Sequence, residues 1–301
     1  MSASVHIAVM LEETMLGLEP HNGGTYVDGT LGGATHTREL LKLSAPNGRV
    51  YSFDVDPQAL SRAKETLAEY GDRWQGIDAN FRTMADSLRA IGVNSVDGIL
   101  LDLGFSSDEI SDPKKGLSFQ LEGPLDMRLG PKANEDGLTA ADIVNTWKVT
   151  ELTEMIRNFG EEKFAFRIAT AIADARRVSR ITRTIELAGI IKAAVPGHYE
   201  QGRIHPATRT FQALRMAVND EIQSLKQAIE SAYSILAPNG RLAIISFHSI
   251  EDRVVKLALK DEVKWTNVYK KPLVPSDAEL SANPRSRSAK LRVAIKNEPS
   301  L

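Results

Sequence analysis

The stretch TYVDGTLGGATHTREL, residues 25–40, begins like a buried strand and ends like a helix. Its apolar run stops at Asp28, and Gly29, Gly32 and Gly33 follow before the helical pattern begins. Glycine lets the backbone approach a ligand closely or adopt positive φ, and open α/β sheets bind ligands at the carboxyl ends of their strands. The stretch therefore predicts a strand, a turn and a helix that together hold a cofactor.

Other short apolar runs alternate with helical patterns along the chain. The runs cover residues 25–30, 49–56, 74–81, 96–104, 241–248 and 289–296, and helical patterns cover 35–43 and 57–70. Buried strands that alternate with helices are typical of a parallel, doubly wound sheet. The predicted fold class is α/β, with a Rossmann-like core.

The middle of the chain breaks this alternation. No strong strand pattern occurs from about 111 to 206, whereas residues 139–147, 162–177 and 184–195 have helical patterns. We therefore expect a core formed by residues 1–110 and 207–301, with residues 111–206 inserted as a helical, substrate-recognition domain. A long helix over about 207–237 and an extended loop over 264–288 are also expected.

Composition excludes several classes of function. The chain of 301 residues has no cysteine, which excludes disulfides, thiolate nucleophiles and cysteine-ligated metals. Its six histidines have no close ligand spacing, so no metal site is expected. No signal peptide or long apolar run is present, which predicts a cytoplasmic protein without a membrane partner. The net charge of −2 means that a nucleic acid would need local basic patches.

Four side chains follow predicted strands and should meet at one edge of the sheet: Asp28, Asp54, Phe81 and Asp102. Asp54 occupies the place of a ribose-binding acid. The glycine spacing G-x-x-G-G differs from the G-x-G-x-x-G of dinucleotide sites. Asp28 would repel a pyrophosphate but suits a ligand that carries an amino group and a sulfonium. These features favour S-adenosylmethionine over a nicotinamide cofactor, although each acid alone could equally cap a turn.

Longer motifs narrow the choice of protein family. Beside VDGTLGGATH and LLDLGFSS, the chain contains GPLDMR (123–128), FGEEKFAFRIATAI (159–172), HPATRTFQALR (205–215), ISFHSIEDR (245–253) and NPRSRSAKLR (283–292). Over essentially its whole length it resembles the RsmH/MraW family of bacterial ribosomal RNA small-subunit methyltransferases. The resemblance implies methylation of a cytosine N4 in the decoding region of 16S ribosomal RNA, with S-adenosylmethionine as cofactor. A partly assembled small subunit is the expected partner, and a homodimer is left open.

The resemblance also implies cofactor contacts in the turn and at the strand ends. With Asp28 and Gly32 from the reasoning above, the expected cofactor residues are Asp28, Gly32, Ala34, Thr35, His36, Asp54, Phe81, Asp102 and Glu109. Two of them depart from the family pattern: Thr35 stands where glycine is common, and Glu109 where glutamine is frequent. Both departures bear on cofactor affinity.

The segment from Asp102 to Ser107 is the predicted substrate-facing loop. Catalysis requires the target nitrogen, the methyl carbon and the sulfur in line, and an acceptor near the amino group helps to localise its lone pair. Asp102, Ser106 and Ser107 are candidate polar groups, and Phe105 is a candidate to stack on a flipped base. His248, weighed against a purely structural role, and the pair Asp126 and Arg128 are further candidates.

Two basic stretches are candidate phosphate contacts. The first contributes Lys163, Arg167, Arg176, Arg177, Arg180 and Arg183, and the second contributes Arg285, Arg287, Lys290, Arg292 and Lys296. Each alone could be a solvated helix face or a charged edge strand. Two other functions stay open on the residues alone: an NAD-dependent oxidoreductase and a non-catalytic RNA-binding assembly factor.

Overall fold

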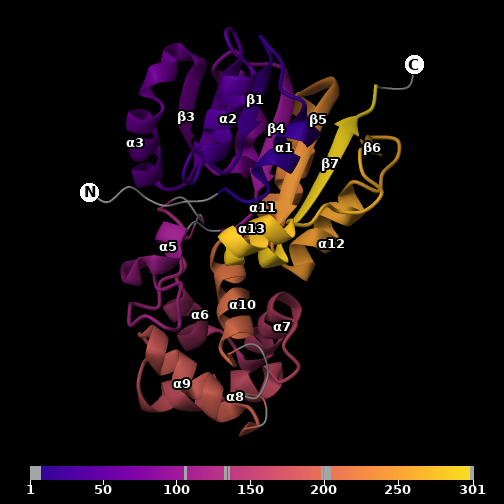
Figure 1. Cartoon of the computed structure of the whole chain (residues 1–301). Coiled ribbons are helices and arrows are strands. Elements are labelled where there is room, and N and C mark those ends of the chain that lie inside the picture. The colour runs from indigo at the N-terminus through magenta and orange to yellow at the C-terminus, as the bar shows by residue number, and fades with distance from the viewer. Residues whose placement is uncertain are drawn as a thin grey trace. The chain divides into compact units, whose positions relative to one another are not determined.

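The computed structural model describes residues 8–104, 107–131, 134, 136–197, 199 and 205–298 (Figure 1). The chain divides into two units, one made of residues 1–104 and 222–301 and the other of residues 105–221. Each unit has its own hydrophobic core.

The first unit contains a seven-stranded sheet in the order β3-β2-β1-β4-β5-β7-β6. Its strands are β1 (Thr25–Asp28), β2 (Arg49–Asp54), β3 (Trp74–Asp78), β4 (Val96–Asp102), β5 (Leu236–Ser246), β6 (Trp265–Asn267) and β7 (Lys290–Lys296). Strands β1 to β5 pair in parallel, but β7 pairs antiparallel with both β5 and β6. The α/β fold is thus confirmed. The expected parallel pairing holds for β1 to β5, and β7 makes the sheet mixed.

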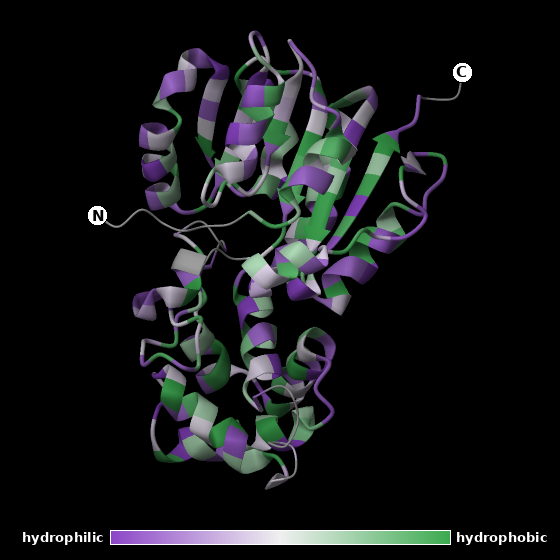
Figure 2. Cartoon of the chain, in the orientation of Figure 1, coloured by the Kyte–Doolittle hydropathy of each residue, from purple (hydrophilic) through white to green (hydrophobic). Residues whose placement is uncertain are grey.

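Helices cover both faces of this sheet, because alternate residues of each strand point to opposite sides. On one face, Val27, Ile99 and Leu101 share a core with α4 (Met84–Ala90), α11 (Glu221–Ile235) and α12 (Ser249–Ala258). On the other, Tyr26 and Leu100 pack with α1 (Leu11–Leu18), α2 (Thr35–Leu43) and α3 (Pro57–Thr66). Figure 2 shows hydrophobic residues along the central strands between these layers. The fold is therefore doubly wound, as expected.

The order of the strands creates one switch point. From β1 the chain proceeds outward through β2 to β3, and it then returns to β4 on the other side of β1. In open α/β sheets, ligands generally bind at the carboxyl ends of the two strands that flank such a switch point, here β1 and β4.

The second unit is helical. It contains α5 (Ser107–Ser111), α6 (Ala140–Thr146), α7 (Val149–Gly160), α8 (Ala165–Val178), α9 (Thr184–Ala194) and α10 (Thr208–Val218). Thr139 and Asp142 form a capping box that starts α6. Buried apolar residues of α6 to α10 form one core, which includes Ile143, Ile156 and Ile172.

The expected long helix over 207–237 is instead two helices. α10 ends before Asn219, and Asp220 has a φ of 47°, a left-handed conformation that interrupts the helix before α11 begins. Phe211 and Leu214 of α10 belong to the core of the helical unit. The structural division therefore falls at Gly104 and Glu221, outside the boundaries expected at 110 and 207.

The segment expected as an extended loop, 264–288, has regular structure. It contains β6, the helix α13 (Asp277–Ala282) and a 3₁₀ turn, η5 (Pro284–Ser288). Among the described residues, no helix combines the length and apolar character needed to cross a bilayer.

Candidate active site

Three carboxylates lie at the carboxyl edge of the sheet, as the sequence predicts. Asp28 ends β1, and its register partners are Ser52 of β2 and Leu100 of β4. Asp54 and Asp102 each lie two residues further along these neighbouring strands. All three therefore border the switch point.

The turn after β1 is held tightly against β4. The Gly29 N–H donates to the Leu100 carbonyl at 2.8 Å, and a Cβ on Gly29 would lie 2.4 Å from the Leu101 side chain. Gly32 has a φ of 48° and Ala34 a φ of 60°, so the turn twice adopts the left-handed conformation before α2 starts. Only glycine fits at position 29, because any side chain there would displace Leu101.

Asp28 is directed into the protein. It is 1% exposed, its Oδ2 accepts a 2.7 Å hydrogen bond from the Thr37 hydroxyl, and its Oδ1 accepts from the Thr30 N–H at 3.1 Å. Burial raises the pKa of Asp28, and these hydrogen bonds oppose that shift. Its described contacts thus hold the turn to α2, and the predicted contact with a cationic cofactor stays a prediction.

Asp54 joins the end of β2 to the same turn. Its Oδ2 accepts from the Gly32 N–H at 3.1 Å, and its Oδ1 accepts from the Asp56 N–H at 2.9 Å. Each carboxylate oxygen can accept a second hydrogen bond, and Asp54 is partly exposed. These bonds fix the side chain of Asp54 beside the turn, and its predicted contact with ribose hydroxyls stays a prediction.

Asp102 ends β4 beside the turn. Its N–H donates to the Thr30 hydroxyl at 2.7 Å, and its side chain is 15% exposed. Its Oδ1 is buried and has no hydrogen-bond partner among the described residues. Burial raises the pKa of Asp102 well above its ordinary value, and the carboxylates of Asp28, Glu251 and Glu279 add to the shift.

His36 lies in the first turn of α2 and is 5% exposed. Its Nε2 is 3.1 Å from the Val9 carbonyl, and its Nδ1 is 3.7 Å from Oδ2 of Asp102. Because a carbonyl only accepts, Nε2 carries a proton and Nδ1 faces the carboxylate. Thr35, the first residue of α2, is partly exposed.

Phe81 follows β3 and starts a short 3₁₀ turn, η2 (Phe81–Thr83), which the side chain of Asn80 caps. Phe81 packs against the core beneath the sheet edge, and its Cβ would lie 3.2 Å from a Cβ on Gly29. It therefore flanks the turn, where it was expected.

Other candidates lie in the helical unit. Glu109 of α5 forms a 3.1 Å ion pair with Lys115. Arg128 binds Asp126 through two side-chain hydrogen bonds of 2.8 and 2.7 Å. Partial burial acts to raise the pKa of Asp126, but the hydrogen bonds from Arg128 outweigh burial, so the pKa lies below its ordinary value. Phe105 and Ser106 lie outside the described residues, as does the side chain of Ser107.

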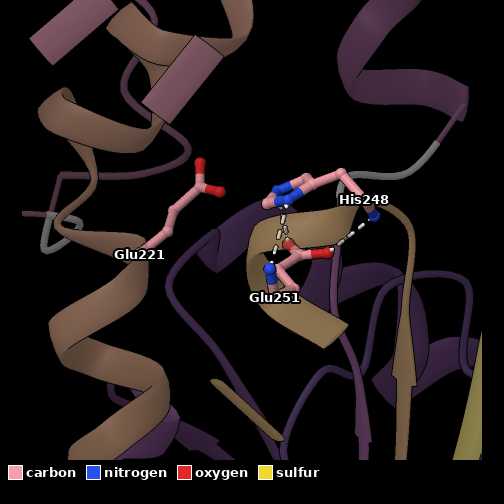
Figure 3. A group of neighbouring side chains, drawn as sticks. All are labelled: Glu221, His248 and Glu251. Carbon is pink, nitrogen blue, oxygen red and sulfur yellow. Dashed lines mark hydrogen bonds and ion pairs between the residues drawn. The ribbon is translucent and has the colours of Figure 1, made fainter. Parts of the chain in front are cut away.

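His248 caps a helix (Figure 3). Its Nδ1 accepts from the Glu251 N–H at 3.3 Å, and Glu251 returns a bond by accepting from the His248 N–H at 3.3 Å. Glu251 also accepts from the Phe247 N–H at 2.9 Å. The Nε2 atom of His248 also lies 3.1 Å from Oε1 of Glu251. The structural role weighed for His248 thus agrees with its capping contacts, and its catalytic role stays a prediction.

The basic residues of α8 and the segment after it mostly have partners. Arg177 pairs with Asp174 at 2.9 Å, Arg180 pairs with Asp142 at 3.0 Å, and Arg183 pairs with Glu122. Arg176 donates to the Val144 carbonyl at 2.8 Å. Lys163 and Arg167 lie over the ring of Phe164. Phosphate binding by this stretch stays a prediction.

The sequence profile of the MraW methylase family matches residues 3–297, nearly the whole chain. The chain belongs to the MraW methylase family. This assignment confirms the expected resemblance and the expectation of a methyltransferase that uses S-adenosylmethionine. It overturns the alternative of an NAD-dependent oxidoreductase.

Relatives of this methylase are similar along their full length. A ribosomal RNA small subunit methyltransferase H from Geobacter sulfurreducens is 45% identical over 309 residues, covering 97% of this chain and 98% of the relative. The protein of the same name from Synechococcus elongatus is 46% identical and covers 96% and 94%. A crystal structure of a putative rRNA methylase from Clostridium thermocellum aligns with a TM-score of 0.48 at 15% identity, covering 96% and 98%.

Sequence reasoning missed several residues that hold the candidate site together. Thr30 and Thr37 hold Asp28 and the end of β4, and Glu279 accepts from the Met10 N–H at 2.7 Å. A threonine in a glycine-rich turn is a weak signal that could have pointed to Thr30. Glu279 is 269 residues away from its partner, so no local pattern could reveal it.

Proposed function

We propose that the protein transfers a methyl group from S-adenosylmethionine to the N4 amino group of a cytosine in the decoding region of 16S ribosomal RNA. Its substrate would be a partly assembled small ribosomal subunit. The family assignment and the names of the full-length relatives support a ribosomal RNA substrate.

The observation that carries the proposal is Oδ1 of Asp102. A buried carboxylate oxygen without a hydrogen-bond partner among the described residues has the free lone pairs that an amino group needs. It lies at the carboxyl edge of the sheet, where the switch point predicts the cofactor. A cytosine amino group that donates to Oδ1 would have its lone pair directed away from that oxygen, toward an incoming methyl group.

The raised pKa of Asp102 suits the removal of a proton from the methylated nitrogen. Methyl transfer to an amino nitrogen leaves a cationic nitrogen, which must lose a proton. A carboxylate whose charged form is disfavoured by burial is a better proton acceptor than an exposed one. Asp102 would therefore orient the amino group first and accept its proton afterwards.

Mass spectrometry of 16S ribosomal RNA from a deletion strain tests this function. Complementation with the wild-type gene is expected to restore one methyl group on a single cytosine, and fragmentation should place it on N4. Asp102→Ala should restore less than about 1% of that mark, the loss typical of a missing acid–base group. A methyl group at another atom, or a mark that persists in the deletion strain, would overturn the proposal.

The same strains separate catalysis from a non-catalytic assembly role. If Asp102→Ala restores normal subunit assembly without the methyl group, the protein acts as an assembly factor and the mark is incidental. Comparing naked 16S ribosomal RNA with subunits from the deletion strain as substrates then defines the partner. We expect methylation of the subunits only.

A further inference from the structure

The five basic residues of the C-terminal stretch divide into two groups. Lys290 and Arg292 both bind Asp252, at 3.1 and 2.8 Å, and Lys296 donates to the Leu236 carbonyl at 2.6 Å. These three side chains stabilise β7 and its neighbours. Arg285 and Arg287 are exposed, and among the described residues no hydrogen bond or ion pair of their side chains is found.

A well-anchored turn carries these two arginines. Ser286 between them is fully buried, and its hydroxyl donates to the Asn283 carbonyl at 2.8 Å. The Ala289 N–H donates to the Ser286 carbonyl at 2.8 Å, and Asn283 is 9% exposed. Burial of the residue between them turns both arginines outward on a fixed backbone, which lowers the entropy lost when they bind a ligand.

The turn lies at the same edge of the sheet as Asp102. Because β7 is antiparallel to β5, its first residue, Lys290, pairs with Ser246 at the carboxyl end of β5. The residue before Ser246, Ile245, pairs with Asp102. η5 ends two residues before Lys290, so Arg285 and Arg287 lie at the carboxyl edge of the sheet, where Asp102 also lies.

A chain of contacts also connects this segment with Asp102. Glu279 of α13 accepts from the Met10 N–H, and the preceding carbonyl, that of Val9, bonds His36, which faces Asp102. α13 and η5 are consecutive, and the Asn283 N–H between them donates to the Glu279 carbonyl at 2.6 Å. The arginines are therefore fixed relative to the candidate active site.

Charge indicates the ligand. Residues 268–289 contain the basic residues Lys270, Lys271, Arg285 and Arg287 and the acidic residues Asp277 and Glu279, so four minus two leaves a local charge of +2 in a chain of net charge −2. Guanidinium groups bind phosphate through two parallel hydrogen bonds. We propose that Arg285 and Arg287 bind backbone phosphates of the ribosomal RNA strand that carries the target nucleotide. This inference rests on the proposed function.

The test measures binding to small subunits isolated from the deletion strain, at constant Mg²⁺ and several KCl concentrations. The double variant Arg285→Ala/Arg287→Ala should bind on the order of tenfold more weakly. Its slope of log affinity against log salt should be shallower by about 1.4, because each single-strand phosphate contact contributes about 0.7. Affinity for S-adenosylmethionine, measured by calorimetry on the protein alone, should stay unchanged. Arg285→Lys/Arg287→Lys should keep the wild-type slope.

Arg49→Ala provides the matched control, since Arg49 is exposed at the start of β2, on the opposite edge of the sheet. It should leave both affinity and slope unchanged. If wild-type protein methylates the subunits but the double variant binds them with an unaltered slope, the arginine inference is wrong and the proposed function stands. A loss of S-adenosylmethionine binding would assign the arginines to the cofactor instead. Failure of the wild-type protein to methylate the subunits would overturn the proposed function itself.

Discussion

Nδ1 of His36 lies 3.7 Å from Oδ2 of Asp102, while Nε2 of the same ring is 3.1 Å from the Val9 carbonyl. The ring therefore joins the start of α2 to the end of β4 and to the segment before α1. His36 was expected only as a cofactor contact. Its described partners place it beside the candidate catalytic carboxylate, and its contact with the cofactor stays a prediction.

His36→Ala should therefore impair both stability and catalysis. The change removes a buried ring and leaves the Val9 carbonyl without this partner, at a cost of about 2 kcal/mol in the free energy of unfolding. Urea unfolding measures that loss, and methylation assays at saturating S-adenosylmethionine should show a lower kcat. A variant with wild-type kcat would mean that Asp102 does not depend on His36. Lys64→Ala, at an exposed position of α3, is the control.

Asp102→Asn should make the protein more stable at neutral pH. In the unfolded chain Asp102 ionises near its ordinary pKa of 3.8, whereas burial keeps it protonated to higher pH in the folded protein. Between these two pKa values the folded state binds more protons, so wild-type stability falls as pH rises through the folded pKa. Asparagine has no such dependence. The difference in Tm should vanish well below pH 3.8, where the wild-type side chain is uncharged in both the folded and the unfolded state.

Thermal unfolding of both proteins across a pH series provides the measurement. Asp72→Asn, at an exposed position, should shift Tm little at any pH. An unchanged or lower Tm for Asp102→Asn at neutral pH would show that the carboxylate is stabilised in the folded protein by a partner.

Thr37→Val should destabilise the turn after β1. Thr37 donates to Asp28 at 2.7 Å and lies 2.8 Å from the Ser52 hydroxyl, and valine preserves its shape without the hydroxyl. Leaving a buried carboxylate short of one hydrogen bond costs about 2 kcal/mol. Affinity for S-adenosylmethionine should fall as well. Thr66→Val, whose hydroxyl bonds an exposed carbonyl of its own helix, should change neither quantity by much.

Two glycine substitutions should have opposite effects. Gly29→Ala brings a Cβ within 2.4 Å of Leu101, and such overpacking costs about 1–3 kcal/mol. Gly189 lies inside α9 with no atom within 4 Å of an added Cβ, so Gly189→Ala should stabilise by about 0.5–1 kcal/mol. Chemical denaturation of both variants checks the prediction. Equal effects would show that the turn can move away from β4.

Periodic patterns of the sequence predicted most of the fold. Six strands and the first two crossover helices were expected, because short apolar runs alternate with helical patterns along the chain. β6 has three residues, too few to show alternation, and α1 and α13 have eight and six. The interruption between α10 and α11 has no glycine or proline to mark it, because the left-handed residue is Asp220.

The site was predictable only where the strands position it. Parallel strands bring their ends to one edge, so Asp28, Asp54 and Asp102 could be grouped from sequence alone. The hydrogen-bond donors to each carboxylate could not be predicted, because Asp28 accepts from Thr37 of α2 and Asp54 accepts from the backbone of the turn. Such contacts depend on side-chain geometry across elements, which residue patterns do not encode.

The antiparallel strand β7 has a consequence for biosynthesis. It follows both β5 and β6 in sequence, yet it lies between them in the sheet. A ribosome synthesises residues 247–289 before it reaches β7, so a nascent chain exposes the apolar edge of β5 until residues 290–296 have emerged. The sheet therefore cannot be completed before β7 is made, and truncation before Lys290 should yield an aggregating product rather than a smaller functional one.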